Sequence, residues 1–262
     1  MGFEFKKSLG QNFLRDDNVI HKIVDSALID KDTLVIEVGP GQGAISRLIV
    51  PKAKFSILYE IDNRLDCFLN NVLSGNSNYK IIMNDFLKED VTSELSRYQY
   101  DKLYMVANLP YYITTPIITK LIDEDILPDK IVIMIQKEVA LRFSATVNSR
   151  DYGALTVFLN YYYDIQKLFD VSRNCFIPKP NVDSAVVCMT LKKDRLLVKD
   201  IDFFKNLIKD SFRYKRKNLR NNLKGYDLDR IENVLKRNGL NLNSRAENVS
   251  LDVFVEMANE LV

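Results

Sequence analysis

The tetrapeptide Asn108-Leu109-Pro110-Tyr111 contains the residue types that could activate a weakly nucleophilic amine. The Asn108 side-chain oxygen and the Leu109 carbonyl could each accept one amine hydrogen, which favours the tetrahedral nitrogen that attack on a methyl group requires. Pro110 fixes the turn and has no N–H that needs a partner. Tyr111 could stack on a base that has been taken out of its helix. The tetrapeptide therefore indicates methyl transfer to the exocyclic amine of an adenine, and an ordinary strand-to-helix turn is the alternative.

Glycines and carboxylates follow three earlier apolar runs. Gly39, Gly41 and Gly43 would let the backbone approach a ligand closely and turn into a helix. Their G-x-G-x-G spacing differs from the G-x-G-x-x-G fingerprint of dinucleotide-binding proteins. Glu60 could accept both hydroxyl hydrogens of a ribose, and Asp85 could accept the amino group of an adenine. We therefore expect a nucleoside cofactor beside the tetrapeptide.

These residues stand where apolar strands end in an alternating strand–helix pattern. Such alternation predicts an α/β domain whose parallel sheet is covered on both faces. Ligands bind such a sheet at the carboxyl ends of its strands. Two later strands without a helix between them predict an antiparallel hairpin at one edge, and the pattern then becomes helical. The expected strands are 33–38, 54–59, 80–83, 102–107, 130–135, 164–171 and 184–191, and the expected domains are 1–192 and 193–262.

The composition excludes several kinds of protein. The chain has 262 residues, of which 47% are hydrophobic and 27% charged, which is ordinary for a globular protein and unlike a disordered one. No apolar run approaches the length of a membrane-spanning helix. The three cysteines are far apart and the single histidine, His21, stands alone, so we expect neither a metal site nor a disulfide framework. We expect a monomer in the reducing cytoplasm.

A basic segment in the last third of the chain carries aromatic residues and no acid. The net charge of the whole chain is only +2, but this segment concentrates positive charge beside Phe212 and Tyr214. A cationic patch with aromatics is typical of proteins that bind a phosphate backbone, and a solvated helix face is the alternative. We expect nucleic acid to bind through Arg213, Lys215, Arg216, Lys217, Arg220 and Lys224.

Together these segments resemble the KsgA-type ribosomal RNA adenine dimethyltransferases, close relatives of the Erm methyltransferases. The resemblance covers nearly the whole chain, and no motif is broken. Glu60, Asp85 and Asn108 fall at the family's ribose, adenine and catalytic positions. The other matching segments are Ser8-Leu9-Gly10-Gln11-Asn12-Phe13-Leu14, Glu37-Val38-Gly39-Pro40-Gly41-Gln42-Gly43, Phe176-Ile177-Pro178-Lys179-Pro180-Asn181-Val182-Asp183-Ser184, Arg213-Tyr214-Lys215-Arg216-Lys217 and Ser244-Arg245-Ala246-Glu247.

The resemblance implies a Rossmann-like methyltransferase fold, with a seven-stranded sheet whose last strand is antiparallel and a small helical RNA-binding domain. It implies S-adenosyl-L-methionine as methyl donor. It also implies dimethylation of two adjacent adenosines near the 3' end of 16S rRNA, within a pre-30S or 30S particle, and a role in small-subunit biogenesis. Tyr111 and Phe176 would stack on the base. The implied cofactor site consists of Gln11, Asn12, Leu14, Gly39, Gly41, Glu60, Ile61, Asp85, Phe86 and Asn108.

The sequence leaves other functions open. An Erm-type enzyme would methylate one adenosine of 23S rRNA, whereas the NLPY form and the RKNLRNNL stretch favour the KsgA type. A non-catalytic rRNA-binding assembly factor would not need intact Asn108 and Glu60. A DNA adenine methyltransferase uses a similar motif, but the basic C-terminal helix suits RNA. The glycine spacing disfavours an NAD-dependent dehydrogenase.

Overall fold

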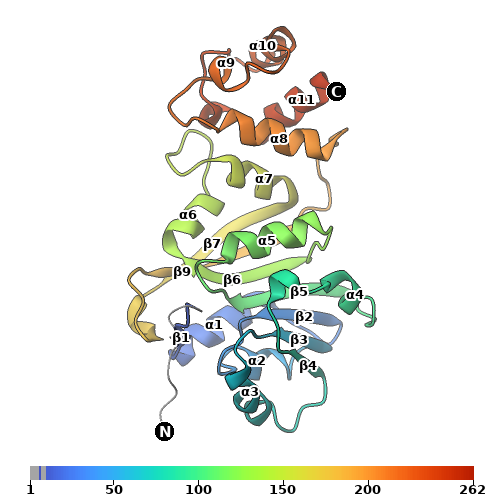
Figure 1. The fold of residues 1–262 in the computed structure, drawn as a ribbon, viewed down its shortest axis with the longest axis vertical. Coiled ribbons are helices and arrows are strands. Elements are labelled where there is room, and N and C mark those ends of the chain that lie inside the picture. The colour runs from blue at the N-terminus through green and yellow to red at the C-terminus, as the bar shows by residue number, and fades with distance from the viewer. Residues whose placement is uncertain (1–5, 7–9) are drawn as a thin grey trace. The chain divides into compact units, whose positions relative to one another are not determined.

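The computed structural model describes residue 6 and residues 10–262, which form two compact units. The larger unit contains the described residues up to Ala140 together with Gln166–Leu191. The smaller unit contains Leu141–Ile165 and Lys192–Val262. Each unit has a buried apolar core of its own, and both can be followed by colour along the chain in Figure 1.

A mostly parallel sheet organises the larger unit. Its strands are β2 (Thr33–Val38), β3 (Phe55–Tyr59), β4 (Tyr79–Ile82), β5 (Lys102–Asn108), β6 (Lys130–Gln136), β7 (Tyr163–Val171) and β9 (Ser184–Leu191). They lie in the order β4-β3-β2-β5-β6-β9-β7, so the chain reverses direction across the sheet between β2 and β5. The strands from β4 to β6 are parallel, and β9 is antiparallel to β6. The predicted methyltransferase sheet, including its antiparallel last strand, is confirmed.

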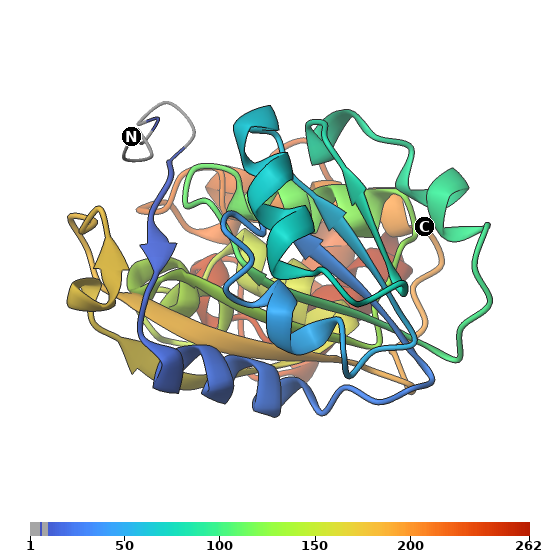
Figure 2. The same ribbon diagram turned by 90° about the horizontal axis from the view of Figure 1, so that it is seen from below.

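The central strands are continuous apolar runs because helices cover both faces of the sheet. Every residue of β2 is buried. The helix α1 (Asp17–Ala27) packs on β5 and β6, and Asp16 caps it by accepting the N–H of Val19 at 3.1 Å. Figure 2 shows α1 in blue on one side of the strands and α5 (Thr114–Asp123) in green on the other. The remaining short helices here are α2 (Ser46–Ile49), η2 (Asn63–Leu65), α3 (Asp66–Val72), η3 (Phe86–Lys88), α4 (Val91–Leu95), η4 (Arg173–Cys175) and the first part of α6 (Lys137–Phe143).

Two very short strands fix the N-terminal segment. The strand β1 (Phe13–Leu14) pairs antiparallel with β8 (Phe176–Ile177), and Leu14 lies opposite Phe176. Next to this pair, the N–H of Arg15 donates to the carbonyl of Cys175 at 2.8 Å. The sequence does not predict these strands, because two residues carry no periodicity. Their pairing holds the segment before α1 against the larger unit.

The smaller unit is helical, and it includes more of the chain than the sequence indicates. Its core joins Tyr152 and Val157 to apolar residues of the C-terminal helices, and the Tyr152 hydroxyl donates to the Val249 carbonyl at 2.9 Å. The segment 141–165, placed in the larger domain by the expected boundary at 192, therefore belongs to the smaller unit. No helix in residues 10–262 is long and apolar enough to cross a membrane. The helices are α7 (Ala154–Tyr162), α8 (Ile201–Ser211), α9 (Leu219–Asn222), α10 (Leu228–Arg237), η5 (Ala246–Asn248) and α11 (Leu251–Leu261).

Candidate active site

A cavity of about 600 Å³ lies where β2, β3, β4 and β5 end, at the point where the strand order reverses. Open α/β sheets bind their ligands at this point. The structure thus brings together residues that the sequence predicts from separate motifs. Ser8 and Leu9, which belong to one of these motifs, lie outside the described residues. The predicted residues that line the cavity are Gln11, Asn12, Leu14, Gly39, Gly41, Glu60, Ile61, Asp85, Phe86, Asn108, Leu109, Pro110 and Tyr111.

The glycine loop after β2 adopts backbone angles that favour glycine. Gly39 has a φ of 71° and Gly41 a φ of 62°, both in the left-handed region. A Cβ atom on Gly41 would lie 2.7 Å from Cε1 of Phe13, closer than real Cβ atoms come to other atoms. The N–H of Gly39 donates to the Tyr59 carbonyl at 2.9 Å, which ties the loop to the end of β3. The loop therefore passes close to Phe13 and leaves backbone accessible to a ligand.

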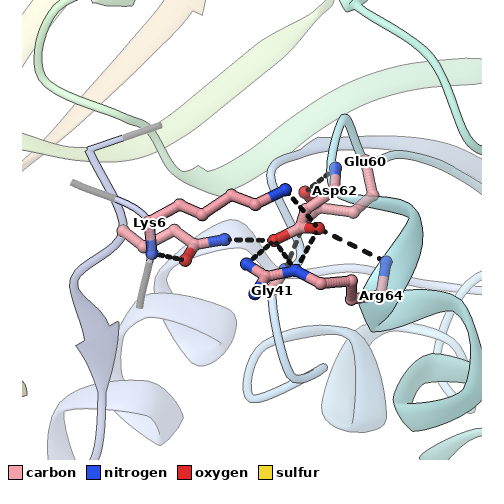
Figure 3. Close-up of polar contacts among 6 residues, drawn as sticks. Lys6, Gly41, Glu60, Asp62 and Arg64 are labelled. Carbon is pink, nitrogen blue, oxygen red and sulfur yellow. Dashed lines mark hydrogen bonds and ion pairs between the residues drawn. The ribbon is translucent and has the colours of Figure 1, made fainter. Parts of the chain in front are cut away.

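Glu60 follows β3 and carries a buried carboxylate that is 5% exposed. Its two oxygens accept the N–H of Gly41 at 3.0 Å and the N–H of Asp62 at 2.9 Å (Figure 3). Burial raises the pKa of Glu60 above its ordinary value. Each carboxylate oxygen has two lone pairs, so each can accept a second hydrogen, as a ribose diol would provide.

Asp62, which the predicted site omits, ties Lys6 and Gln11 to the end of β3 (Figure 3). Gln11 Nε2 donates to Asp62 Oδ2 at 2.8 Å, and Lys6 Nζ lies 3.7 Å from Oδ1. The guanidinium of Arg64, 2.6 Å away, holds the pKa of Asp62 far below its usual value. The backbone N–H of Lys6 donates to Gln11 Oε1 at 2.8 Å, so both ends of the Gln11 amide are held. The sequence signal was available, because Asp62 follows the predicted strand two residues after Glu60.

Asp85 and Phe86 form the wall after β4. Asp85 Oδ1 caps η3 by accepting the N–H of Leu87 at 3.0 Å, whereas Oδ2 accepts no hydrogen bond within residues 10–262. Phe86 is buried, and its ring meets the Tyr59 ring edge to face at a centroid distance of 5.0 Å. This wall therefore offers one unused carboxylate oxygen beside an apolar surface, the combination that an adenine amine and ring require.

Glu37 is a further carboxylate on the cavity wall that the predicted site omits. It is the fifth residue of β2, 1% exposed, and Oε2 accepts the Ser46 hydroxyl at 2.6 Å. Burial is the main cause that raises the pKa of Glu37 from its usual 4.5 to about 8, and the nearby Glu60 charge adds to it. Glu37 is therefore mostly protonated and uncharged at neutral pH. The strand context hides this property from sequence, because a glutamate in an apolar run carries no signal for its pKa.

Asn108 and Leu109 present two acceptors on the cavity wall. Asn108 Nδ2 donates to the Asn12 carbonyl at 3.3 Å, and Oδ1 accepts no hydrogen bond from the described residues. The N–H of Leu109 donates to the Met134 carbonyl at 3.1 Å, which anchors the turn on β6. The Leu109 carbonyl likewise accepts no hydrogen bond within residues 10–262. The two oxygens are thus available to bind the two hydrogens of an amine, as the tetrapeptide predicts.

The two predicted stacking residues differ in their surroundings. Tyr111 lines the cavity, is half-buried, and shares a hydrogen bond of 2.6 Å with the Ser184 hydroxyl. Phe176 is only 2% exposed, because its place opposite Leu14 in the β1–β8 ladder directs it into the apolar core. The structure therefore places Tyr111 on the cavity wall and Phe176 away from it. Stacking on a base stays a prediction for both residues.

The basic segment lies in the smaller unit and is exposed, as the sequence indicates, but it is not one helix. Residues 212–218 form turns between α8 and the four-residue helix α9. Asn218 caps α9 by accepting the N–H of Asn221 at 3.1 Å, which starts a new helix there. Arg213 pairs with Asp210 at 2.8 Å, and Lys215 Nζ donates to the Arg150 carbonyl at 3.0 Å. The predicted residues, all exposed, are Arg213, Lys215, Arg216, Lys217, Arg220 and Lys224.

The cavity fits S-adenosyl-L-methionine on three observations. The glycine loop exposes backbone, Glu60 has lone pairs for a ribose, and Asp85 Oδ2 is unused beside an apolar wall. Ile61, which also lines the cavity, is 45% exposed and adds apolar contact area. In the described part of the chain, no three histidine, cysteine, aspartate or glutamate residues are placed to hold a metal ion.

Comparisons with known proteins give the family. The family model of the ribosomal RNA adenine dimethylases matches residues 2–262. The ribosomal RNA small subunit methyltransferase A of Bacillus licheniformis is 40% identical over 269 residues, which cover 99% of this chain and 92% of that protein. The protein of the same name from Clostridium acetobutylicum is 41% identical over 262 residues. The match covers 99% of this chain and 94% of that protein.

Two solved structures have the same fold at 26% identity. A dimethyladenosine transferase from Plasmodium falciparum has a TM-score of 0.78 and covers 94% of this chain and 95% of its own. The 23S rRNA methyltransferase ErmE has a TM-score of 0.75, and the match covers 95% of this chain and 99% of the ErmE chain. This chain therefore belongs to the ribosomal RNA adenine dimethylase family and is an rRNA methyltransferase that uses S-adenosyl-L-methionine as its cofactor.

Proposed function

We propose that this chain dimethylates the exocyclic amines of two adjacent adenosines near the 3' end of small-subunit rRNA, as a step in the biogenesis of that subunit. The observation that carries the proposal is the pair of unused acceptors, Asn108 Oδ1 and the Leu109 carbonyl, on the wall of the cavity that also contains Glu60 and Asp85. The names of the relatives at about 40% identity support the small subunit as the source of the RNA.

The residues at the end of β5 would act by holding the base. Tyr111 stacks on its face, and Asn108 Oδ1 and the Leu109 carbonyl accept the two amine hydrogens, so that the nitrogen lone pair leaves the ring plane. Bound S-adenosyl-L-methionine supplies an electrophilic methyl group. Positive charge develops on the nitrogen during attack, and fixed acceptors stabilise that charge more than they stabilise the neutral base. The alkylated nitrogen then releases a proton to water.

The smaller unit would bind the RNA backbone. Arg216, Lys217 and Arg220 are exposed and make no ion pair or side-chain hydrogen bond with residues 10–262, so their charges are available to phosphates. The substrate in this proposal is the rRNA of a pre-30S or 30S particle, and the enzyme works as a monomer in the cytoplasm. A reducing compartment agrees with the free thiols of Cys67, Cys175 and Cys188.

The test uses separated ribosomal subunits from cells that lack these methyl groups. The protein is incubated with either subunit and S-adenosyl-L-methionine labelled in the methyl group, and the label in each rRNA is counted. The proposal predicts label in the small-subunit rRNA. Label confined to the large subunit would contradict it and would favour an Erm-type activity, for which the ErmE fold gives the structural precedent. Binding of RNA without transfer to either subunit would instead favour the non-catalytic assembly factor.

A further inference from the structure

The hydroxyl group of Tyr111 needs an explanation that stacking does not supply. A phenylalanine ring would stack on a base equally well, because stacking uses only the face of the ring. The Tyr111 oxygen instead lies 2.6 Å from Oγ of Ser184, a residue with no exposed surface. Burial raises the pKa of the Tyr111 phenol, so the group stays protonated and can donate to this partner.

Ser184 is a rigid anchor. It is the first residue of β9 and lies opposite Gln136, the last residue of β6, in the antiparallel ladder. The preceding residue, Asp183, is held twice. Its carbonyl accepts the N–H of Lys137 at 3.0 Å, and its Oδ1 accepts the N–H of Arg173 at 3.0 Å. The Ser184 hydroxyl is therefore fixed by the sheet rather than by a loop.

Tyr111 has few other restraints. Its own N–H and carbonyl make no hydrogen bond within the described residues, although the flanking Leu109 N–H bonds to Met134 and the Ile113 N–H to Pro110. The side chain is only partly buried and lines the cavity. Within the described residues, the hydroxyl makes the hydrogen bond that ties this side chain to an element outside its own turn.

We propose that Ser184 is a positioning residue for methyl transfer: by holding the Tyr111 hydroxyl, it sets the angle of the ring on which the target base stacks. The inference rests on the function proposed above. A base stacked on a correctly oriented ring presents its amine to Asn108 and Leu109. A ring that rotates freely loses that alignment, and small misplacements of reacting groups cost rate.

The experiment is a double-mutant cycle with Ser184→Ala, Tyr111→Phe and the double variant, in the small-subunit methylation assay. We expect each single variant to lower kcat about three- to tenfold, the range given by the loss of one neutral hydrogen bond. The double variant should be no slower than either single variant, because both remove the same bond. The KM for S-adenosyl-L-methionine should not change, and Ser184→Thr, which keeps the hydroxyl, should recover most of the rate.

Ser56 provides the matched control. It is also a fully buried serine in a strand, but its Oγ makes no hydrogen bond within the described residues, so Ser56→Ala should keep the wild-type kcat. Thermal unfolding shows whether each variant folds. If Ser184→Ala does not fold, Tyr111→Phe still tests the proposal. Wild-type kcat in both single variants, additive losses, or an equal loss in Ser56→Ala would overturn the inference. If the wild-type protein methylates neither subunit, the proposed function itself is wrong and this inference falls with it.

Discussion

Asn108 is the residue on which we expect the proposed chemistry to depend most. Its Nδ2 donates to the Asn12 carbonyl, which leaves Oδ1 as the acceptor of this side chain on the cavity wall. Removing a fixed group that stabilises developing charge typically costs about 10²–10³ in turnover. We expect Asn108→Ala to lose kcat by that factor with nearly unchanged RNA affinity, measured by single-turnover methylation and by RNA titration. The kcat of Asn108→Asp should lie between those of the wild type and Asn108→Ala, because aspartate keeps an acceptor but places an oxygen against the Asn12 carbonyl.

We expect Glu60 to act on cofactor binding rather than on turnover. Its carboxylate holds the N–H groups of Gly41 and Asp62 and would accept the ribose hydroxyls as well. Hydrogen bonds to a charged group contribute roughly 1.5–3 kcal/mol each. Calorimetry on Glu60→Ala should therefore show at least about tenfold weaker binding of S-adenosyl-L-methionine, with circular dichroism like that of the wild type. Unchanged affinity would remove Glu60 from the cofactor site.

Glu37 makes stability depend on pH. The pKa of Glu37 is about 8 in the folded protein and has its usual value of 4.5 when unfolded, so the folded state holds an extra proton between these values. The stability that this proton contributes is fully present below pH 4.5 and is lost as the pH rises through 8. The free energy of unfolding falls with a slope of up to about 1.4 kcal/mol per pH unit between these values.

The variant Glu37→Gln tests this dependence. A glutamine keeps an acceptor for the Ser46 hydroxyl but has no proton to lose. The free energy of unfolding in urea, measured from pH 5 to about 9, should fall less steeply with pH in the variant than in the wild type. Parallel curves for the two proteins would contradict the assignment of this pH dependence to Glu37.

At the scale of elements, the sequence predicts best where a run is long and buried. The strand 33–38 is found with the same bounds because its β-branched and apolar residues form a continuous run and all six of its residues are buried. The glycine loop, Glu60, Asp85 and Asn108 could be named in advance from the expected strand ends, since carboxyl ends of parallel strands converge. Gln11, Asn12 and Leu14 lie outside these strand ends and are expected only from the resemblance to the family. The pair β1–β8 and the burial of Phe176 could not be predicted, because they depend on a contact between segments far apart in the chain.

Gly41 connects the glycine loop to the N-terminal segment. Alanine there would combine a left-handed φ with a Cβ 2.7 Å from the Phe13 ring, so either the loop or β1 must move. We expect Gly41→Ala to weaken S-adenosyl-L-methionine binding at least about tenfold, because the moved loop no longer supports the cavity. Gly239 has a similar φ of 69°, but a Cβ at that position would meet no other atom, so Gly239→Ala should lose only about 1 kcal/mol of stability and keep cofactor affinity. Equal affinities in both variants would show that the loop tolerates a side chain.

At the scale of the whole molecule, the proposed cofactor site lies in the larger unit and the basic segment lies in the smaller one. Neutralising Arg216, Lys217 and Arg220 together should weaken rRNA binding and reduce its salt slope by about 0.7–0.9 for each phosphate that is no longer neutralised. The matched control neutralises Lys236, Arg237 and Arg245, which carry the same charge but are already paired with acids. If both triple variants bind rRNA with the wild-type salt slope, the basic segment is only a solvated surface.

The decisive measurement for the proposed reaction is mass spectrometry of small-subunit rRNA after incubation with this protein and S-adenosyl-L-methionine. Because Asn108 and Leu109 would hold the amine of an adenine, we predict two adjacent adenosines near the 3' end, each carrying two methyl groups on the exocyclic nitrogen. Methyl groups on another base, on a ring nitrogen, or on no nucleotide of this RNA would contradict the proposed reaction.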